Sequence, residues 1–288
     1  MDPLSLIILL LMGTMAGAIN AAVGSGSLLT LPVLLALGIP PGTAVRTNTI
    51  GILFSTFGST YGYRREIAQE KGNLGPLIAV TAACATLGAL LLLVSPMETL
   101  DEIVPLLIVF ALVMVIFQKR ITAAVRAVRE RRTARGSAAD TAGQVDAPVA
   151  AEAAESRAAA DPSARSPYRS RGLIGAMGAA SVYGGYFTAA QGILYLGVLG
   201  AFTGRSMGSV NSIKNLLSLV VNLAAAVVYL IAHLVLGVEI VWIATAAIAV
   251  GALLGGYFGA HLAKRMPGWL LRGIIVAVAL IALVRQIL

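Results

Sequence analysis

Long apolar runs separated by short polar segments extend along almost the whole chain. An α-helix needs about 20 mostly apolar residues to cross the core of a bilayer, because each residue adds about 1.5 Å to its length. Three runs in each half of the sequence meet this requirement, provided that the shortest of them extends into its flanks: 43–62, 74–95 and 103–118 in the first half, and 207–232, 240–260 and 269–287 in the second. The pattern therefore predicts three membrane-spanning helices in each half.

Two further apolar runs, 27–38 and 193–203, have only 12 and 11 residues. As helices they are about 18 Å long at most, which is too short to cross a bilayer. Each follows a longer run, 4–22 or 172–190, after a segment that contains glycine. We therefore predict two helical hairpins, each made of one longer and one shorter helix with a break in the middle.

The charged residues between the runs indicate how the chain is oriented. The segments 63–71, 119–171 and 261–268 are basic, and 119–171 alone holds 11 of the 21 lysines and arginines. The segments 96–102 and 233–239 contain acidic residues and no lysine or arginine. Because basic loops stay in the cytoplasm, the spans of the second half are expected to run in the opposite direction to those of the first.

The two halves also resemble each other in sequence. At an offset of 166 positions, Gly24-Ser25-Gly26 lies on Ala190-Gln191-Gly192, and Gly38 lies on Gly204. Inverted repeats with broken helices are typical of secondary transporters. We therefore predict an all-α, polytopic membrane protein of two inverted repeats, each with a broken helical hairpin and three transmembrane helices.

These repeats are expected to be two membrane domains, residues 1–118 and 172–288, joined by a cytoplasmic linker at 119–171. Residues 119–135 are basic and are able to extend the preceding helix, either as a topology anchor or as a binding segment for lipid headgroups. Residues 136–167 are rich in Ala, Ser, Asp, Glu and Pro and predict a disordered segment.

Composition narrows the class of protein further. The 288 residues are 58% hydrophobic and 12% charged, whereas soluble domains are about 45–50% apolar and about 25% charged. This excludes a soluble enzyme and favours a membrane protein. The net charge of +8 reflects topology rather than nucleic-acid binding, because the basic run lies on a linker without base-reading elements. We find no enzyme motif and no cofactor-binding or metal-binding motif, and Cys84 is the single cysteine.

The breaks of the two hairpins contain the first candidate binding residues, which are Asn20, Gly24, Ser25 and Gly26 in one and Gln191 and Gly192 in the other. Irregular backbone at membrane depth is tolerated only where it is buried in protein or lines a cavity. A half-helix that begins there directs its free N–H groups into the site and favours an anion. The alternative is that the glycines serve only close helix packing.

Polar clusters at the start of the following spans supply further candidates: Arg46, Thr47 and Asn48 in the first half, and Asn211, Lys214 and Asn215 in the second. Lys214 lies about seven residues into an apolar span, where a charge is costly and indicates function by default. Its long side chain is also able to reach the cytoplasmic interface instead, and the asparagines are able to serve helix–helix hydrogen bonding. No carboxylate lies in the middle of a span to relay a proton.

These motifs resemble one known family. Its first-repeat pattern is similar to that of residues 17–48, which contain Gly17-x-x-Asn20, Gly24-Ser25-Gly26-Ser27-Leu28-Leu29, Gly38-Ile39-Pro40 and Ala44-Val45-Arg46-Thr47-Asn48. Its second half is similar to Gln191-Gly192 and Val210-Asn211-Ser212-Ile213-Lys214-Asn215. The family is that of the sulfite exporter TauE/SafE-like permeases. Two departures are Ser25 in place of the middle glycine of a triplet, and Arg46.

The resemblance implies a permease of the bacterial inner membrane for sulfite or organosulfonate-type anions. The residues by themselves favour a secondary transporter that carries an anion or a small polar solute across the lipid bilayer by alternating access, without a cofactor. Two alternatives remain at this point: a passive anion channel of the same architecture, and a membrane anchor or assembly factor that acts through the basic linker.

Overall fold

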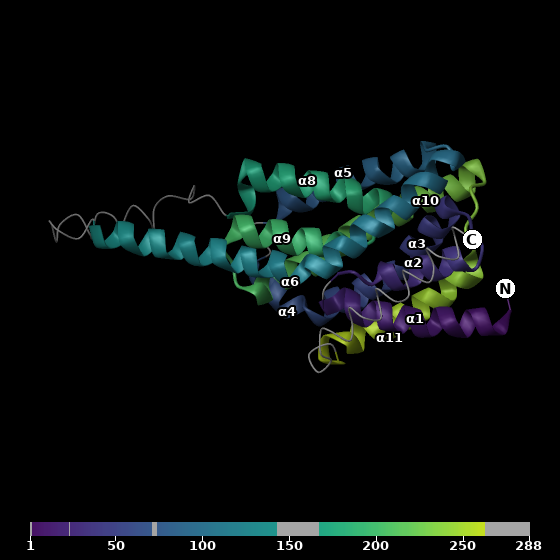
Figure 1. The fold of residues 1–288 in the computed structure, drawn as a ribbon, viewed down its shortest axis with the longest axis horizontal. Coiled ribbons are helices and arrows are strands. Elements are labelled where there is room, and N and C mark those ends of the chain that lie inside the picture. The colour runs from purple at the N-terminus through teal and green to yellow at the C-terminus, as the bar shows by residue number, and fades with distance from the viewer. Residues whose placement is uncertain (1, 23, 71–73, 143–166, 263–288) are drawn as a thin grey trace.

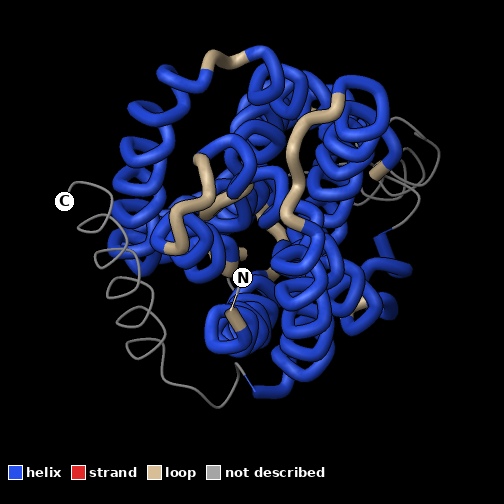
Figure 2. The backbone as a smooth tube through the Cα atoms, turned by 90° about the vertical axis from the view of Figure 1, so that its right-hand side faces the viewer, coloured by secondary structure: helices blue, strands red, loops and turns tan. Residues whose placement is uncertain are grey.

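The computed structural model describes residues 2–22, 24–70, 74–142 and 167–262, and these ranges consist of helices joined by short loops, without a strand (Figure 1). The α-helices are α1 (Pro3–Ala22), α2 (Ser27–Ala36), α3 (Pro41–Gly62), α4 (Arg64–Glu70), α5 (Gly75–Val94), α6 (Met97–Ala142), α8 (Arg171–Phe187), α9 (Gln191–Thr203), α10 (Met207–Leu236) and α11 (Trp242–Leu262). A 3₁₀-helix, η2 (Pro167–Arg169), precedes α8. Figure 2 shows the bundle from one end, with short loops joining the helices.

The predicted hairpins are present, and both are broken. In the first, α1 ends at Ala22 and the 10-residue α2 begins at Ser27. In the second, α8 ends at Phe187 and the 13-residue α9 begins at Gln191. Both short helices are followed by a glycine with positive φ, Gly38 and Gly204, at 79° and 64°. Glycine adopts this conformation without steric cost, so it ends each half-helix at the same position of the repeat.

Four segments of the described chain are long and apolar enough to cross a membrane: Pro3–Ala22, Gly75–Val94, Met97–Gln118 and Met207–Leu236. Large apolar side chains such as Leu11, Leu87 and Leu106 are exposed on their outer faces, as expected for a surface in contact with lipid. The protein is therefore a multi-pass membrane protein.

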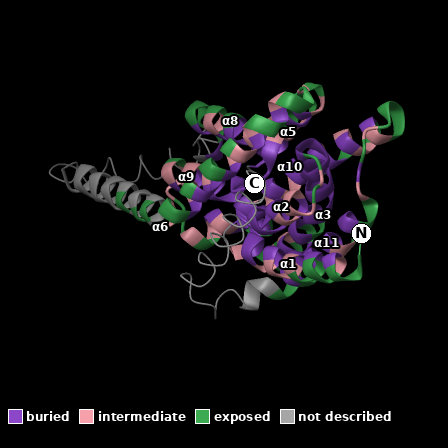
Figure 3. Cartoon of the chain, turned by 45° about the vertical axis from the view of Figure 1, so that its right-hand side comes forward, coloured by how far each residue is buried: buried purple, intermediate pink, exposed green. Residues whose placement is uncertain are grey.

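The predicted span 43–62 corresponds to the 22-residue α3, which is long enough to cross but carries many polar residues. The fold shields it, because 17 of its residues are buried and α1, α2, α10 and α11 all pack against it. Figure 3 shows this concentration of buried residues in the middle of the bundle. A polar central helix surrounded by apolar helices is the arrangement that a hydrocarbon solvent requires.

Helix pairing follows the same scheme in both halves. In the first, α1 packs on α2, α2 on α3, and both α1 and α3 on α11. In the second, α8 packs on α9, α9 on α10, and both α8 and α10 on α5. The starts of α3 and α10, Pro41 and Met207, preserve the offset seen in the sequence. This correspondence is what a repeat requires, while the domain boundaries and the inverted orientation remain predictions.

One expectation about the linker is wrong. Helix α6 has 46 residues and continues to Ala142, beyond the bundle (Figure 1), so residues 136–142 are helical rather than disordered. The segment Gly136–Ala142 has several alanines, which favour helix, and extending an existing helix costs far less than nucleating one. The rest of the predicted disordered segment, 143–166, and the predicted last span, 269–287, lie outside the described residues.

Candidate functional site

The two hairpin breaks touch each other through their backbones. The N–H of Gly192 donates to the carbonyl of Gly24 over 3.1 Å. A Cβ atom on Gly24 would lie 2.5 Å from the Cα of Gly192, and one on Gly192 would lie 2.4 Å from the Cα of Gly24. No other residue type fits at either position, so these two glycines bring the breaks of both repeats into one place. Gly26 is required for a different reason: a Cβ atom added there would lie 2.1 Å from the carbonyl oxygen of Ala16.

Both half-helices begin at this contact without a side-chain cap. The N-cap residues of α2 and α9, Gly26 and Ala190, accept no hydrogen bond through a side chain. By contrast, Ser170 and Ser206 cap α8 and α10. The first N–H groups of α9 bond to nearby carbonyls, such as Gly192 to Gly24 and Ile193 to Ala190, so the breaks are faced by two positive dipole ends rather than by free donors. This is the local arrangement that binds anions at helix N-termini.

Buried polar atoms without a partner accompany these helix ends. They are the hydroxyl of Ser25, both amide atoms of Gln191 and the amide nitrogen of Asn48, on residues that are at most 3% exposed. Asn48 is held beside α2 because its amide oxygen accepts a 2.5 Å hydrogen bond from Thr30. Buried polar groups normally find a partner, so these atoms offer hydrogen bonds to a ligand or to water.

The second break is held in a strained conformation. Thr188 and Ala190 have positive φ angles of 64° and 58°, which are uncommon for residues other than glycine. The hydroxyls of Thr188 and Thr49 lie 2.9 Å apart, and the hydroxyl of Tyr183 donates to the carbonyl of Ala189 over 2.8 Å. Strain of this kind persists only where the surroundings enforce it, and it gathers at functional sites.

The side chain of Lys214, on α10, reaches the C-terminal end of α1. Its ammonium donates to the carbonyls of Asn20 and Ala21 over 3.0 and 3.5 Å, and its side chain is 0% exposed. Asn215 reinforces the same helix end, with a 3.2 Å hydrogen bond from its amide to the carbonyl of Ala21. These contacts satisfy the free carbonyls and the negative dipole end of α1. Lys214 therefore points into the bundle rather than toward the cytoplasmic interface.

Asn20 and Asn211 join helices with their amide groups. The amide of Asn20 donates to the hydroxyl of Ser55 over 3.2 Å. That of Asn211 donates to the hydroxyl of Tyr63 over 3.0 Å. Asn20 thus holds α1 against α3, and Asn211 holds α10 against Tyr63, directly after α3. For Asn211 this is the helix–helix hydrogen bonding that the sequence left open.

Arg46 and Thr47 contact a different part of the molecule. The guanidinium of Arg46 donates to the carbonyl of Glu239 over 3.1 Å and to the hydroxyl of Thr43 over 3.0 Å. Thr47 accepts a 3.1 Å hydrogen bond from the N–H of Val241. Both are therefore bonded to the loop between α10 and α11. The sequence grouped Arg46 with Lys214 in a single site, and their contacts separate them; at the repeat offset, Lys214 corresponds to Asn48.

Sequence reasoning missed three hydroxyl residues that hold the site together: Thr30, Thr49 and Ser55. The repeat offset carried a usable signal, because it places Thr49 on Asn215. Each of these two residues contacts the end of the long hairpin helix in the other half. Thr30 and Ser55 gave no such signal.

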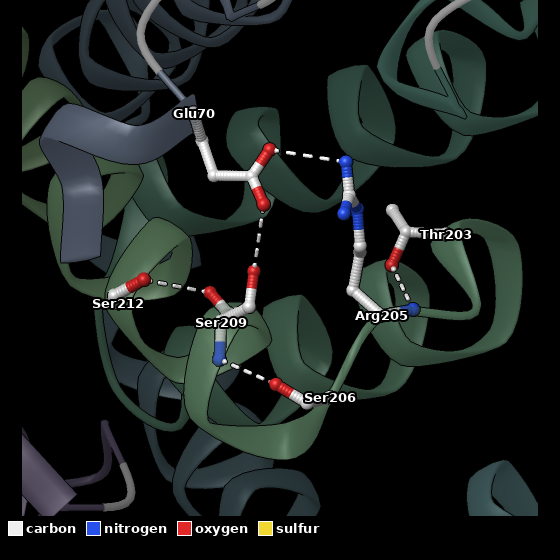
Figure 4. A network of polar contacts seen from close by, with 6 residues as sticks. All are labelled: Glu70, Thr203, Arg205, Ser206, Ser209 and Ser212. Carbon is white, nitrogen blue, oxygen red and sulfur yellow. Dashed lines mark hydrogen bonds and ion pairs between the residues drawn. The ribbon is translucent and has the colours of Figure 1, made fainter.

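A polar network ties the two halves together where α4 packs against α10 (Figure 4). One carboxylate oxygen of Glu70 lies 3.3 Å from the guanidinium of Arg205, and the other accepts a 3.2 Å hydrogen bond from Ser209. The network joins the end of α4 to the start of α10, on which Lys214 and Asn215 lie. It is the one ion pair within the part of the chain that the structure describes.

A groove between α3, α10 and α11 is unsuited to an anion. It has a volume of about 530 Å³ and is lined almost entirely by apolar side chains, among them Leu53, Ala246 and Leu253. An anion there would lose its hydration without gaining hydrogen bonds. The candidate site is therefore the contact between the breaks rather than this larger groove.

A multi-pass helical bundle with two broken hairpins that meet in its interior defines the class of membrane permeases rather than enzymes. The family model for the sulfite exporter TauE/SafE matches residues 9–285, so the chain belongs to this family.

Two relatives are similar over shorter regions. A probable membrane transporter protein ORF9 from Sinorhizobium sp is 35% identical over 94 residues, which are 33% of this chain and 36% of that protein. A probable membrane transporter protein YfcA from Escherichia coli (strain K12) is 33% identical over 112 residues, which are 38% of this chain and 40% of that protein. The chain thus matches well under half the length of each relative. No solved structure matches the chain significantly.

Proposed function

We propose that this protein is a secondary transporter of the inner membrane that carries a small oxyanion, sulfite or an organosulfonate, by alternating access. One observation carries the proposal: the uncapped N-termini of α2 and α9 meet at the Gly24–Gly192 contact, within a bundle that also buries Lys214. The residue set for the anion is Ser25, Asn48, Gln191, Lys214 and the backbone of the two breaks.

The electrostatics of this region favour negative charge. Helix N-termini contribute positive potential, and within the described part of the chain the ammonium of Lys214 donates to backbone carbonyls only. Among the described residues, no carboxylate forms an ion pair with Lys214. A cation in the same place would meet uncompensated positive charge in a medium of low dielectric constant, where Coulomb interactions are strong.

The closed contacts at both ends support a carrier rather than an open pore. Eleven of the twelve residues proposed from the sequence are buried, and Asn211 is partly exposed. The Glu70–Arg205 pair lies at the end with the basic α6 extension, which we propose is cytoplasmic. The hydrogen bond from Arg46 to the carbonyl of Glu239 closes the opposite end, at the loop between α10 and α11. Alternating access would open one end at a time.

The test measures flux of radiolabelled sulfite, and then of a panel of sulfonates, in proteoliposomes. A carrier gives saturable flux. Lys214→Met is expected to lower it roughly 10-fold to 100-fold, since a charge-assisted hydrogen bond contributes about 1.5–3 kcal/mol. Lys119→Met, which removes a lysine from the α6 extension, serves as the matched control and should transport normally.

Other outcomes separate the alternatives. Flux that does not saturate indicates a channel. Well-inserted protein without any anion flux contradicts the proposal and favours a role for the linker in binding a partner. Normal sulfite flux in the Lys214→Met variant would remove this lysine from the site.

A further inference from the structure

Arg46 is a buried cation whose partners are neutral. Arg46 is only 8% exposed. Its guanidinium donates hydrogen bonds to a backbone carbonyl and to a hydroxyl. No carboxylate of the described chain forms an ion pair with it. Removing a guanidinium from water without a counter-ion is costly. The exposed Glu239 attracts Arg46 electrostatically but forms no ion pair with it, so a bound oxyanion would complete the charge compensation.

The guanidinium also has unused donors. It carries five N–H groups in a planar fork, and the contacts among the described residues engage only Nε and Nη2. The third nitrogen, Nη1, faces Gly42, where a Cβ would lie 3.3 Å away. Leu100 lies on the same side, because its Cδ1 would be 2.9 Å from that Cβ, so Gly42 and Leu100 border the free edge of the fork. Such a fork matches the geometry of an oxyanion, which accepts two parallel hydrogen bonds.

Arg46 is well separated from Lys214. Thr60, also on α3, donates to the carbonyl of Asn215 over 3.2 Å and so marks the level of Lys214 on the neighbouring helix. Arg46 and Thr60 are about 21 Å apart along α3 at the rise of an α-helix. Thr49, which contacts the second break, lies between them on this helix. The two buried cations thus lie on opposite sides of the hairpin contact.

We propose that Arg46 forms a second oxyanion subsite, in series with the Lys214 site, at the end of the permeation path where α3 begins. This inference rests on the proposed function. An oxyanion that arrives past the α10–α11 loop would bind the guanidinium fork first, then pass to the donors at the breaks and to Lys214. The two subsites differ in chemistry, because Arg46 offers a rigid fork and Lys214 a single charged donor beside two helix ends.

The test counts bound anions by equilibrium binding of radiolabelled sulfite to the purified full chain. The wild-type protein is expected to bind two sulfite ions per chain at saturation. Arg46→Met and Lys214→Met should each bind one, and the double variant none. Arg46→Lys keeps the charge but loses the fork, so its second site should persist with weaker affinity.

A matched control separates binding from simple structural support. Thr245 ties α11 to α3 near the same end, because its hydroxyl donates to the carbonyl of Thr47 over 3.5 Å and to that of Val241 over 3.2 Å. Thr245→Val removes these bonds without changing charge and should still bind two anions. If it loses one anion as Arg46→Met does, Arg46 is only a structural tie and the inference fails.

The same experiment keeps the two proposals apart. A wild-type chain that binds one sulfite, lost in Lys214→Met and kept in Arg46→Met, overturns the second subsite and leaves the transporter proposal standing. A wild-type chain that binds no anion overturns both.

Discussion

At the scale of single residues, Gln191 and Asn20 show how burial alone fails to reveal a role. Both are amides with at most 7% exposure, and both lie at a hairpin break. The amide of Asn20 donates to Ser55, whereas neither amide atom of Gln191 has a partner. A partnered amide stabilises the fold, while an unpartnered one costs free energy until a ligand or water reaches it.

This difference predicts opposite effects of two near-isosteric substitutions. Gln191→Met should raise the KM for sulfite about 10-fold, because one ligand hydrogen bond contributes about 1 kcal/mol or more, without lowering the Tm. Asn20→Leu should lower the Tm, because it leaves the hydroxyl of Ser55 without its donor. Thermal unfolding in detergent and flux kinetics measure the two effects, and a marked fall in Tm for Gln191→Met would assign it a structural role instead.

At the scale of elements, each crossing helix supports the broken hairpin of the other half. Lys214 and Asn215 on α10 bind the end of α1, and Thr49 on α3 contacts Thr188 beyond the end of α8. The half-helices α2 and α9 then meet at two glycines. A movement of either crossing helix therefore acts on the binding region formed by both breaks.

Gly192→Ala should separate the half-helices. Its new Cβ would lie 2.4 Å from a backbone atom of Gly24, and backbone cannot move aside as a flexible side chain does. Overpacking of this kind costs about 1–3 kcal/mol, so sulfite flux should fall roughly 5-fold or more while the protein still inserts. Gly75→Ala is the control, since no atom lies within 4 Å of its added Cβ; equal activity of the two variants would contradict a tight contact between the breaks.

At the scale of the whole molecule, the two ends are closed by similar contacts. At one end, the first turns of α10 bond to α4, which follows α3, through Ser209 and Glu70. At the other, the first turns of α3 bond to the loop that follows α10, through Arg46 and Glu239. Each closure thus joins the start of one crossing helix to the chain after the other, as a two-fold relation between the halves would require.

Glu70→Gln should loosen the end near the α6 extension. The pair is partly exposed, with side-chain exposures of 12% and 45%, so its loss is worth about 1 kcal/mol at most, or roughly a fivefold change in the open population. A single cysteine at Ser212, in a Cys84→Ser background, should then react several times faster with a membrane-impermeant maleimide. Glu66→Gln, an exposed neighbour on α4, is the control, and equal labelling of both variants would argue against a gate.

Much of the fold could be predicted because its determinants are local. The apolar runs predicted α1, α5 and α10 closely, and the glycine-containing interruptions predicted both breaks. The extent of α6 was underestimated, because a polar, alanine-rich segment gives no periodic signal although it continues an existing helix. The polarity of α3 was visible in the sequence, but its shielding on several sides depends on helices from both halves.

The sequence by itself determined the class of protein, the two broken hairpins and most of the residues near them, since hydropathy, length and glycine content act over short distances. Only the tertiary structure decided which polar atoms are already satisfied. Lys214 and Arg46 looked equivalent as buried cations, yet their hydrogen bonds reach partners 194 and 193 positions away and place them on opposite sides of the hairpin contact. Such pairings depend on how helices pack and on where their free backbone groups lie, and no local pattern encodes either.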